Sequence, residues 1–224
     1  TGINFGLGQR LKWPDDYFQL SQALSFQHYN LNNYNTGLFT FGDGFSNNLA
    51  YTIGIGRNST SANPIYPRFG SDFSLNAKVT LPYSAFNGVD YKGLSDERIA
   101  MGEVLANDPT EGEAVDAQER VSEIDQLRFN WLEYYKIKFQ ATWYTTLIGD
   151  LVLRPKAEFG FLGAYNKNRG IPPFERFFLG GDGLGAFSLD GREVVQLRGY
   201  PNQSLSTNDG SSIYNKFSLE LRYP

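Results

Sequence analysis

The chain has 224 residues, a formal net charge of −4, no cysteine and a single histidine, which excludes disulfide bonds and thiolate metal sites. It contains 18 Phe, 14 Tyr and 24 Gly, a composition typical of membrane-spanning strands with aromatic girdles at the two interfaces. The sequence has no run of about 18 apolar residues, so it offers no transmembrane helix.

Apolar and polar residues alternate with a period of two along the N-terminal part, which predicts strands with two different faces. In the first of these strands Ile3, Phe5 and Leu7 point one way and the residues between them point the other. The pattern continues over 18–26, 49–56 and 69–81. Residues 13–16 indicate a short turn and 58–67 a moderate connection, while the polar stretch 30–48 is predicted to be a loop.

Three further strands are predicted at 135–147, 151–165 and 216–223, and here the polar face carries charge while the apolar face carries none. The side chains predicted to face lipid are Phe139, Trp143, Phe159, Phe161, Phe217 and Leu221. The side chains predicted to face a polar interior are Lys138, Arg154, Lys156 and Glu220.

A soluble β-sandwich would also alternate, with its apolar face in a core. Three features favour a membrane barrel: strands of about ten residues, connections that alternate between short and long, and aromatic residues at strand ends. The aromatic clusters are Trp131, Tyr134 and Tyr135, and Phe174, Phe177 and Phe178. We therefore predict an all-β chain, with residues 1–224 forming part of a transmembrane antiparallel β-barrel. Short connections would be periplasmic, and 30–48, 83–130 and 166–212 would be extracellular.

The connection 83–130 is an acidic insertion. Residues 95–126 contain ten acidic and two basic side chains, a charge of −8, which leaves +4 for the rest of the chain. Ala114, Ala117, Val121 and Ile124 recur at nearly helical spacing. Two interpretations stay open: a small amphipathic helix that covers the barrel mouth or docks a partner, and a solvated acidic loop.

The connection 166–212 holds the candidate functional motif, Leu197-Arg198-Gly199-Tyr200. Gly199 permits a tight turn that other residues resist, and a guanidinium held by such a turn can bind a carboxylate through two hydrogen bonds. The alternative is that Arg198 is a solvated loop charge. The segment that leads into this motif is rich in aromatic residues and glycine: Phe174, Phe177, Phe178, Gly180 and Gly181.

This pattern resembles the BamA-type outer-membrane protein assembly factors, members of the outer-membrane insertase superfamily, whose signature in this loop is Val/Ile-Arg-Gly-Phe/Tyr. Leu197 departs mildly from that signature. The resemblance implies that the chain supplies about seven of sixteen barrel strands, with the lateral seam strands outside it. It also implies that Arg198 enters the lumen and pairs with a glutamate. Counting by two along the last strand places Glu220 on the inward face.

The implied function is to fold and insert β-barrel proteins into the outer membrane of a Gram-negative bacterium. The implied partners are outer-membrane lipid, nascent barrel clients, and accessory lipoproteins or surface-exposed subunits. The alternatives are a related two-partner secretion transporter and a passive porin-like channel.

Chemical catalysis has little support in the sequence, so we expect no enzyme and no cofactor. His28 is the only histidine, and the glycine run 181–185 lacks the lysine of a phosphate loop. Asp182 and Asp190 are scattered loop acids, from which we predict no metal site. The positive residues alternate inward along strands and form no exposed basic patch, which argues against nucleic-acid binding.

Overall fold

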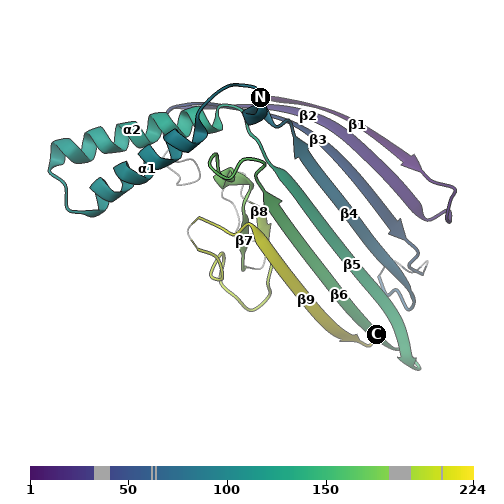
Figure 1. Ribbon diagram of the computed structural model, residues 1–224. Helices are drawn as coiled ribbons and strands as arrows, with labels where there is room; N and C mark the ends of the chain where they lie inside the picture. The colour runs from purple at the N-terminus through teal and green to yellow at the C-terminus, as the bar shows by residue number, and fades with distance from the viewer. Residues whose placement is uncertain (33–40, 62, 64, 182–192, 208) are drawn as a thin grey trace.

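The computed structural model describes residues 1–224 except 33–40, 62, 64, 182–192 and 208. Seven strands form one antiparallel sheet in the order β1-β2-β3-β4-β5-β6-β9 (Figure 1). Their bounds are β1 Gly2–Arg10, β2 Phe18–Leu31, β3 Gly44–Asn58, β4 Gly70–Thr80, β5 Tyr135–Ile148, β6 Leu151–Gly163 and β9 Ile213–Arg222. The predicted β-sheet of about seven strands is therefore confirmed, although the acidic insertion adds two helices.

The register gives the sheet one apolar and one polar face. Phe5 pairs with Leu24, Leu24 with Tyr51, and Tyr51 with Val79, so apolar side chains line up across neighbouring strands. Trp143, Phe161, Phe217 and Leu221 are all exposed on this face. On the other face Lys78 lies opposite Lys136. The apolar face is the lipid face of a barrel wall, and the polar face is its lumenal face.

The connections lie alternately at the two ends of the sheet: β1–β2, β3–β4 and β5–β6 are joined at one end, and the other three connections lie at the other (Figure 1). The predicted alternation in length holds only in part, because the β2–β3 connection, 32–43, is about as long as the β3–β4 connection, 59–69. The predicted loop 30–48 was too long, because β2 continues to Leu31 and β3 already begins at Gly44. The polar side chains there are buried and hydrogen-bonded: the Ser46 hydroxyl donates to the Phe129 carbonyl at 2.7 Å, and the Asn48 amide donates to the Tyr134 hydroxyl at 3.2 Å.

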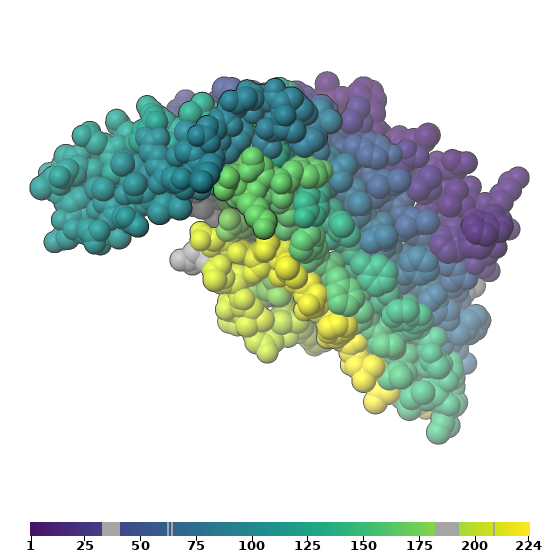
Figure 2. Space-filling model, viewed as in Figure 1, coloured from purple at the N-terminus to yellow at the C-terminus, as the bar shows by residue number. Residues whose placement is uncertain are grey.

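The acidic insertion folds into two helices, α1 (Tyr91–Ala106) and α2 (Glu111–Phe129), which pack on each other as a helical hairpin. Of the two interpretations of this stretch, the helical one is confirmed for its secondary structure, while its role as a cover of the barrel mouth or a dock for a partner stays a prediction. Thr110 and Glu113 form a capping box that starts α2, and Ala117, Val121 and Ile124 are buried. The hairpin projects well clear of the sheet, on the side where β7 and β8 lie (Figures 1 and 2).

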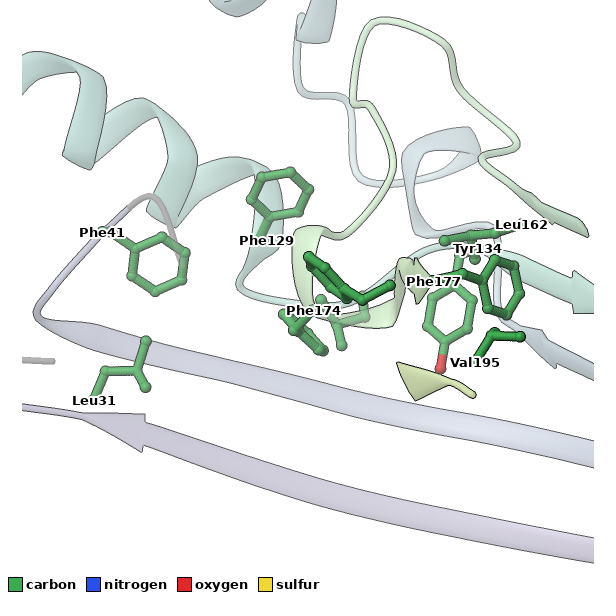
Figure 3. Close-up of a cluster of buried hydrophobic side chains, with 10 residues drawn as sticks. Leu31, Phe41, Phe129, Tyr134, Leu162, Phe174, Phe177 and Val195 are labelled. Atoms are coloured by element: carbon green, nitrogen blue, oxygen red, sulfur yellow. The ribbon is translucent and has the colours of Figure 1, made fainter. Parts of the chain in front are cut away.

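The described residues of the long connection after β6 fold over the lumenal face, and we call them the lumenal loop. It contains the 3-10 turn η2 (Pro173–Glu175), β7 (Phe177–Leu179) and β8 (Glu193–Val195), and β7 and β8 pair in parallel. Phe174, Phe177 and Phe178 are at most 7% exposed and belong to a core with Leu162 and Tyr134 (Figure 3).

That core corrects the prediction of an aromatic girdle at Phe174, Phe177, Phe178 and Tyr134. These rings do not reach a membrane interface, because they fill the space between the lumenal loop and the barrel wall. Burying these rings removes apolar surface from water and so stabilises the docking of the loop on the polar face of the sheet. Trp131, which is 37% exposed, is compatible with a girdle position.

Candidate functional site: how the lumenal loop is held

The Leu197–Tyr200 motif forms the predicted tight turn. The Tyr200 amide donates to the Leu197 carbonyl at 3.3 Å, and Gly199 has a φ of +90°. The turn lies against the lead-in segment, because the Gly181 amide donates to the Tyr200 carbonyl at 3.0 Å and the Leu197 amide donates to the Gly181 carbonyl at 2.9 Å. The structure thus brings the motif and its lead-in together.

Two lead-in glycines make this close approach possible. Gly180 and Gly181 have φ values of +118° and +101°, a region that favours glycine. A Cβ atom would lie 2.5 Å from the Pro201 carbonyl oxygen at Gly180 and 2.0 Å from Asn202 Oδ1 at Gly181. The segment after the motif therefore packs where any larger residue would have placed a side chain.

The structure does not form the predicted ion pair between Arg198 and Glu220. Glu220 instead receives a 2.8 Å hydrogen bond from Arg154, its direct neighbour across the β6–β9 register. Arg198 is exposed and makes no ion pair or hydrogen bond to any residue in the described part of the chain. A cross-strand neighbour is fixed by the ladder, so it reaches the carboxylate at a smaller entropic cost than a loop side chain.

The ion pairs that hold the lumenal loop to the wall have their charges the other way round from the predicted pair: the carboxylates are on the loop and the cations, all lysines, are on the wall. Glu175 Oε1 lies 2.8 Å from Lys78 Nζ, and its Oε2 lies 3.1 Å from Lys136 Nζ. Glu193 Oε2 lies 2.6 Å from Lys136 Nζ, and its Oε1 lies 2.9 Å from Lys138 Nζ. We call these five side chains the loop lock. They join η2 and β8 of the loop to β4 and β5 of the wall.

Glu175 is the most enclosed carboxylate of the loop lock. The Tyr134 hydroxyl donates to its Oε1 at 2.7 Å, and Lys136 Nζ also donates to its backbone carbonyl at 2.8 Å. Lys136 is 5% exposed and lies over the ring of Phe177, 4.7 Å from its centre. Such enclosure requires that each charge be paired, because an unpaired buried charge is costly.

The two carboxyl groups titrate accordingly. Burial alone would raise the pKa of Glu175, but the Lys78 and Lys136 ammonium groups outweigh it and lower the pKa to about 2. Burial likewise opposes ionisation of Glu193, and Lys136 and Lys138 hold its pKa below the ordinary value. Both groups are therefore charged at neutral pH.

A second contact fastens the lumenal loop to the base of the helical hairpin. Arg169 and Glu133, both 1% exposed, form an ion pair of 3.1 Å. Glu133 also accepts from the amide and the hydroxyl of Ser84, each at 2.7 Å. Arg169 Nε donates to the Arg128 carbonyl at 2.8 Å, and Arg128 Nε donates to the Arg169 carbonyl at 2.9 Å. Loop, hairpin and barrel rim thus share one buried polar network.

The sequence prediction missed the loop lock, although the positions of its three lysines already indicated that carboxylates should lie nearby. Lys136 and Lys138 follow each other on the inward face of one strand, opposite Lys78 on the next, and three like charges so placed require nearby carboxylates. The prediction considered Glu220 alone and overlooked Glu175 within the lead-in segment. Asp182, Asp190, Gly183 and Gly185 lie outside the described residues. Among the residues described, no three acidic or histidine side chains gather as metal ligands.

A sheet with one lipid face, and with a loop folded onto its other face, defines this chain as a segment of a transmembrane antiparallel β-barrel. Within the described residues neither helix is long and apolar enough to cross a membrane. The Omp85 superfamily domain matches residues 104–224, which is more than half of the sequence. The chain therefore belongs to the Omp85 superfamily.

Two individual proteins extend this assignment. The chain is 29% identical over 92 residues to the outer membrane protein assembly factor BamA of Neisseria meningitidis serogroup B, which is 41% of this chain and 10% of that protein. The crystal structure of BamA from Haemophilus ducreyi lacking POTRA domains 1-3 matches with a TM-score of 0.59 and 17% identity, over 100% of this chain and 37% of that one. The chain thus spans a minor part of either relative, and the second likeness shows the fold.

Proposed function

We propose that this chain is part of the barrel of an outer-membrane protein assembly factor, which folds and inserts β-barrel proteins into the outer membrane of a Gram-negative bacterium. Its partners would be nascent barrel clients, outer-membrane lipid and accessory lipoproteins. The activity requires no covalent chemistry and no cofactor. Membership of the Omp85 superfamily and the sequence similarity to the Neisseria assembly factor support this proposal.

The observation that carries the proposal is the lumenal loop, which is docked on the inner wall by the loop lock. A passive channel needs an open lumen, whereas a docked loop fills part of it and braces β4 against β5. In the proposed mechanism a client strand adds to an exposed strand edge of the barrel through backbone hydrogen bonds. A braced wall keeps the rest of the barrel intact while that edge is open.

The test is client folding by the full-length protein reconstituted into lipid vesicles. We expect the protein to accelerate folding of a small outer-membrane β-barrel, measured as the heat-sensitive shift of the folded client in electrophoresis. Changing Glu175→Gln and Glu193→Gln together should slow that folding severalfold. Glu97→Gln is the matched control, because Glu97 pairs with Arg120 on the helical hairpin and takes no part in the loop lock.

Two results would contradict the proposal. Vesicles that conduct ions but do not accelerate client folding would indicate a porin-like channel. A protein that exports one partner polypeptide and leaves barrel clients unfolded would indicate a secretion transporter.

A further inference from the structure

A pocket of about 210 Å³ lies where the helical hairpin meets the lumenal loop. Three arginines from three segments line it: Arg98 from α1, Arg128 from α2, and Arg176 from the turn that follows η2. We call it the arginine pocket. Its other lining residues include the carboxylates Asp125 and Asp209. Neither the family motif nor the loop lock uses it.

Each of the three guanidinium groups has N–H donors to spare. Arg98 uses Nε and Nη2 on Asp125, at 2.7 and 2.9 Å, and its Nη1 has no acceptor among the described residues. Arg128 uses Nε and Nη1, and its Nη2 likewise has no acceptor there. Arg176 makes one hydrogen bond to a described residue, from Nη1 to the Asp209 carbonyl at 3.2 Å. All three arginines are partly exposed and line the same pocket.

The charge balance of the arginine pocket is positive. Asp125 is fully buried and committed to Arg98 and Arg128, which it binds at 2.7 and 3.1 Å. Asp209 is exposed, so solvent screens its carboxylate. The buried Arg169 adds a further guanidinium behind Arg128. Burial, together with the positive charges of Arg98 and Arg169, lowers the pKa of Arg128 despite its contact with Asp125.

We propose that the arginine pocket binds a phosphate group, supplied either as inorganic phosphate or as a phosphorylated lipid headgroup. Guanidinium groups match phosphate oxygens with paired N–H donors. Three arginines approach from α1, α2 and the loop, so a tetrahedral anion with several acceptor oxygens satisfies them better than a planar carboxylate with two. The available volume accommodates a phosphate but not a nucleotide. The bound anion would join the helical hairpin to the lumenal loop.

The test measures binding to the detergent-purified protein by calorimetry, with two probes. One is inorganic phosphate and the other is phosphatidic acid in mixed micelles, with lipid-free micelles of the same non-ionic detergent as the blank. We expect saturable binding of at least one probe and none of the blank. Arg176→Gln should weaken that binding about tenfold, because it removes charge-assisted hydrogen bonds. Arg176 makes only one contact to a described residue, a backbone carbonyl, so this change disturbs the fold least.

Arg120→Gln is the matched control. Arg120 is on the same helix as Arg128 but binds Glu97 and Glu123 away from the arginine pocket, so this variant should bind like the unchanged protein. Binding of phosphate without phosphatidic acid identifies the free anion as the ligand, and tighter binding of phosphatidic acid identifies a headgroup. The proposal is overturned if neither probe binds, if Arg176→Gln binds as tightly as the unchanged protein, or if Arg120→Gln is weakened equally. None of these outcomes depends on client folding.

Discussion

Glu175 joins the lumenal loop to the wall more firmly than any other described carboxylate, since it contacts Lys78, Lys136 and Tyr134 at once. Glu175→Gln leaves Lys78 without its carboxylate partner and leaves Glu193 as the remaining carboxylate on the enclosed Lys136. We expect the docked loop to lose about 3 kcal/mol relative to the undocked loop. Limited proteolysis of the folded protein should then cut within 166–212 much faster. Glu97→Gln, at an exposed helical ion pair, should leave that rate unchanged, and equal rates in both variants would contradict the role of Glu175.

The same carboxyl group predicts how loop docking depends on pH. Its pKa falls from 4.5 in the undocked state to about 2 in the docked state, so the docked state binds fewer protons between these values. The stabilisation is therefore complete above about pH 4.5 and is lost as pH falls towards 2. A spin label in the loop should become more mobile across this window. Glu175→Gln should flatten the transition, and an unchanged profile in that variant would assign it to other groups.

Residues 197–200 show what a sequence pattern reveals at this scale. The turn at Gly199 was predictable because one glycine in a short motif determines the local backbone. The absence of a pair between Arg198 and Glu220 was not predictable from the motif. It depends on which cation lies nearest Glu220, and the β6–β9 register places Arg154 there. The prediction placed Glu220 on the inward face but did not compare cross-strand neighbours with the loop.

At the scale of elements, the helical hairpin depends on one buried carboxylate. Asp125 is 0% exposed and binds Arg98 across the hairpin and Arg128 within α2. Asp125→Asn keeps the shape but removes the charge, so we expect the hairpin to lose about 2–3 kcal/mol. Amide hydrogen exchange should speed up in α1 and α2 but not in the sheet. Asp116→Asn, at an exposed position on α2, is the control. Unchanged protection in the Asp125 variant would show that apolar contacts alone hold the two helices.

Only α2 could be anticipated from the sequence. Its apolar residues from Ala114 to Ile124 follow helical spacing, and the structure buries three of them. α1 contains Gly93 and Gly102 and buries only Tyr91, so no apolar stripe marks it. Its contacts to α2 include ion pairs between residues more than twenty positions apart, Arg98–Asp125 and Arg120–Glu97. Pairing at that distance cannot be inferred from periodicity.

At the scale of the whole molecule, the sheet was predictable and the docking of the loop was not. A slip of one residue would exchange the two faces of a strand, so period-two alternation determines which side chains meet lipid. The lumenal loop depends instead on Glu175 and Glu193 meeting lysines about 40 to 100 positions earlier in the chain. The net charge of +4 outside the acidic insertion indicates that the strands are net positive but does not locate the carboxylates that pair with their lysines.

Because the two faces of the wall differ, we expect an arginine introduced at either of two adjacent positions to destabilise the barrel by very different amounts. Phe139 lies mid-strand on the lipid face of β5, beside Phe159, and Gln140 lies on the lumenal face opposite Glu158. Phe139→Arg should destabilise the barrel by about 2–4 kcal/mol, because the guanidinium must enter lipid. Gln140→Arg should cost less, because the new cation faces the polar lumenal side, where Glu158 already pairs with Lys156 and Lys216, and need not enter lipid. Urea unfolding of the protein in lipid vesicles measures both changes. Equal losses at the two positions, or a larger loss for Gln140→Arg, would contradict the assignment of the two faces.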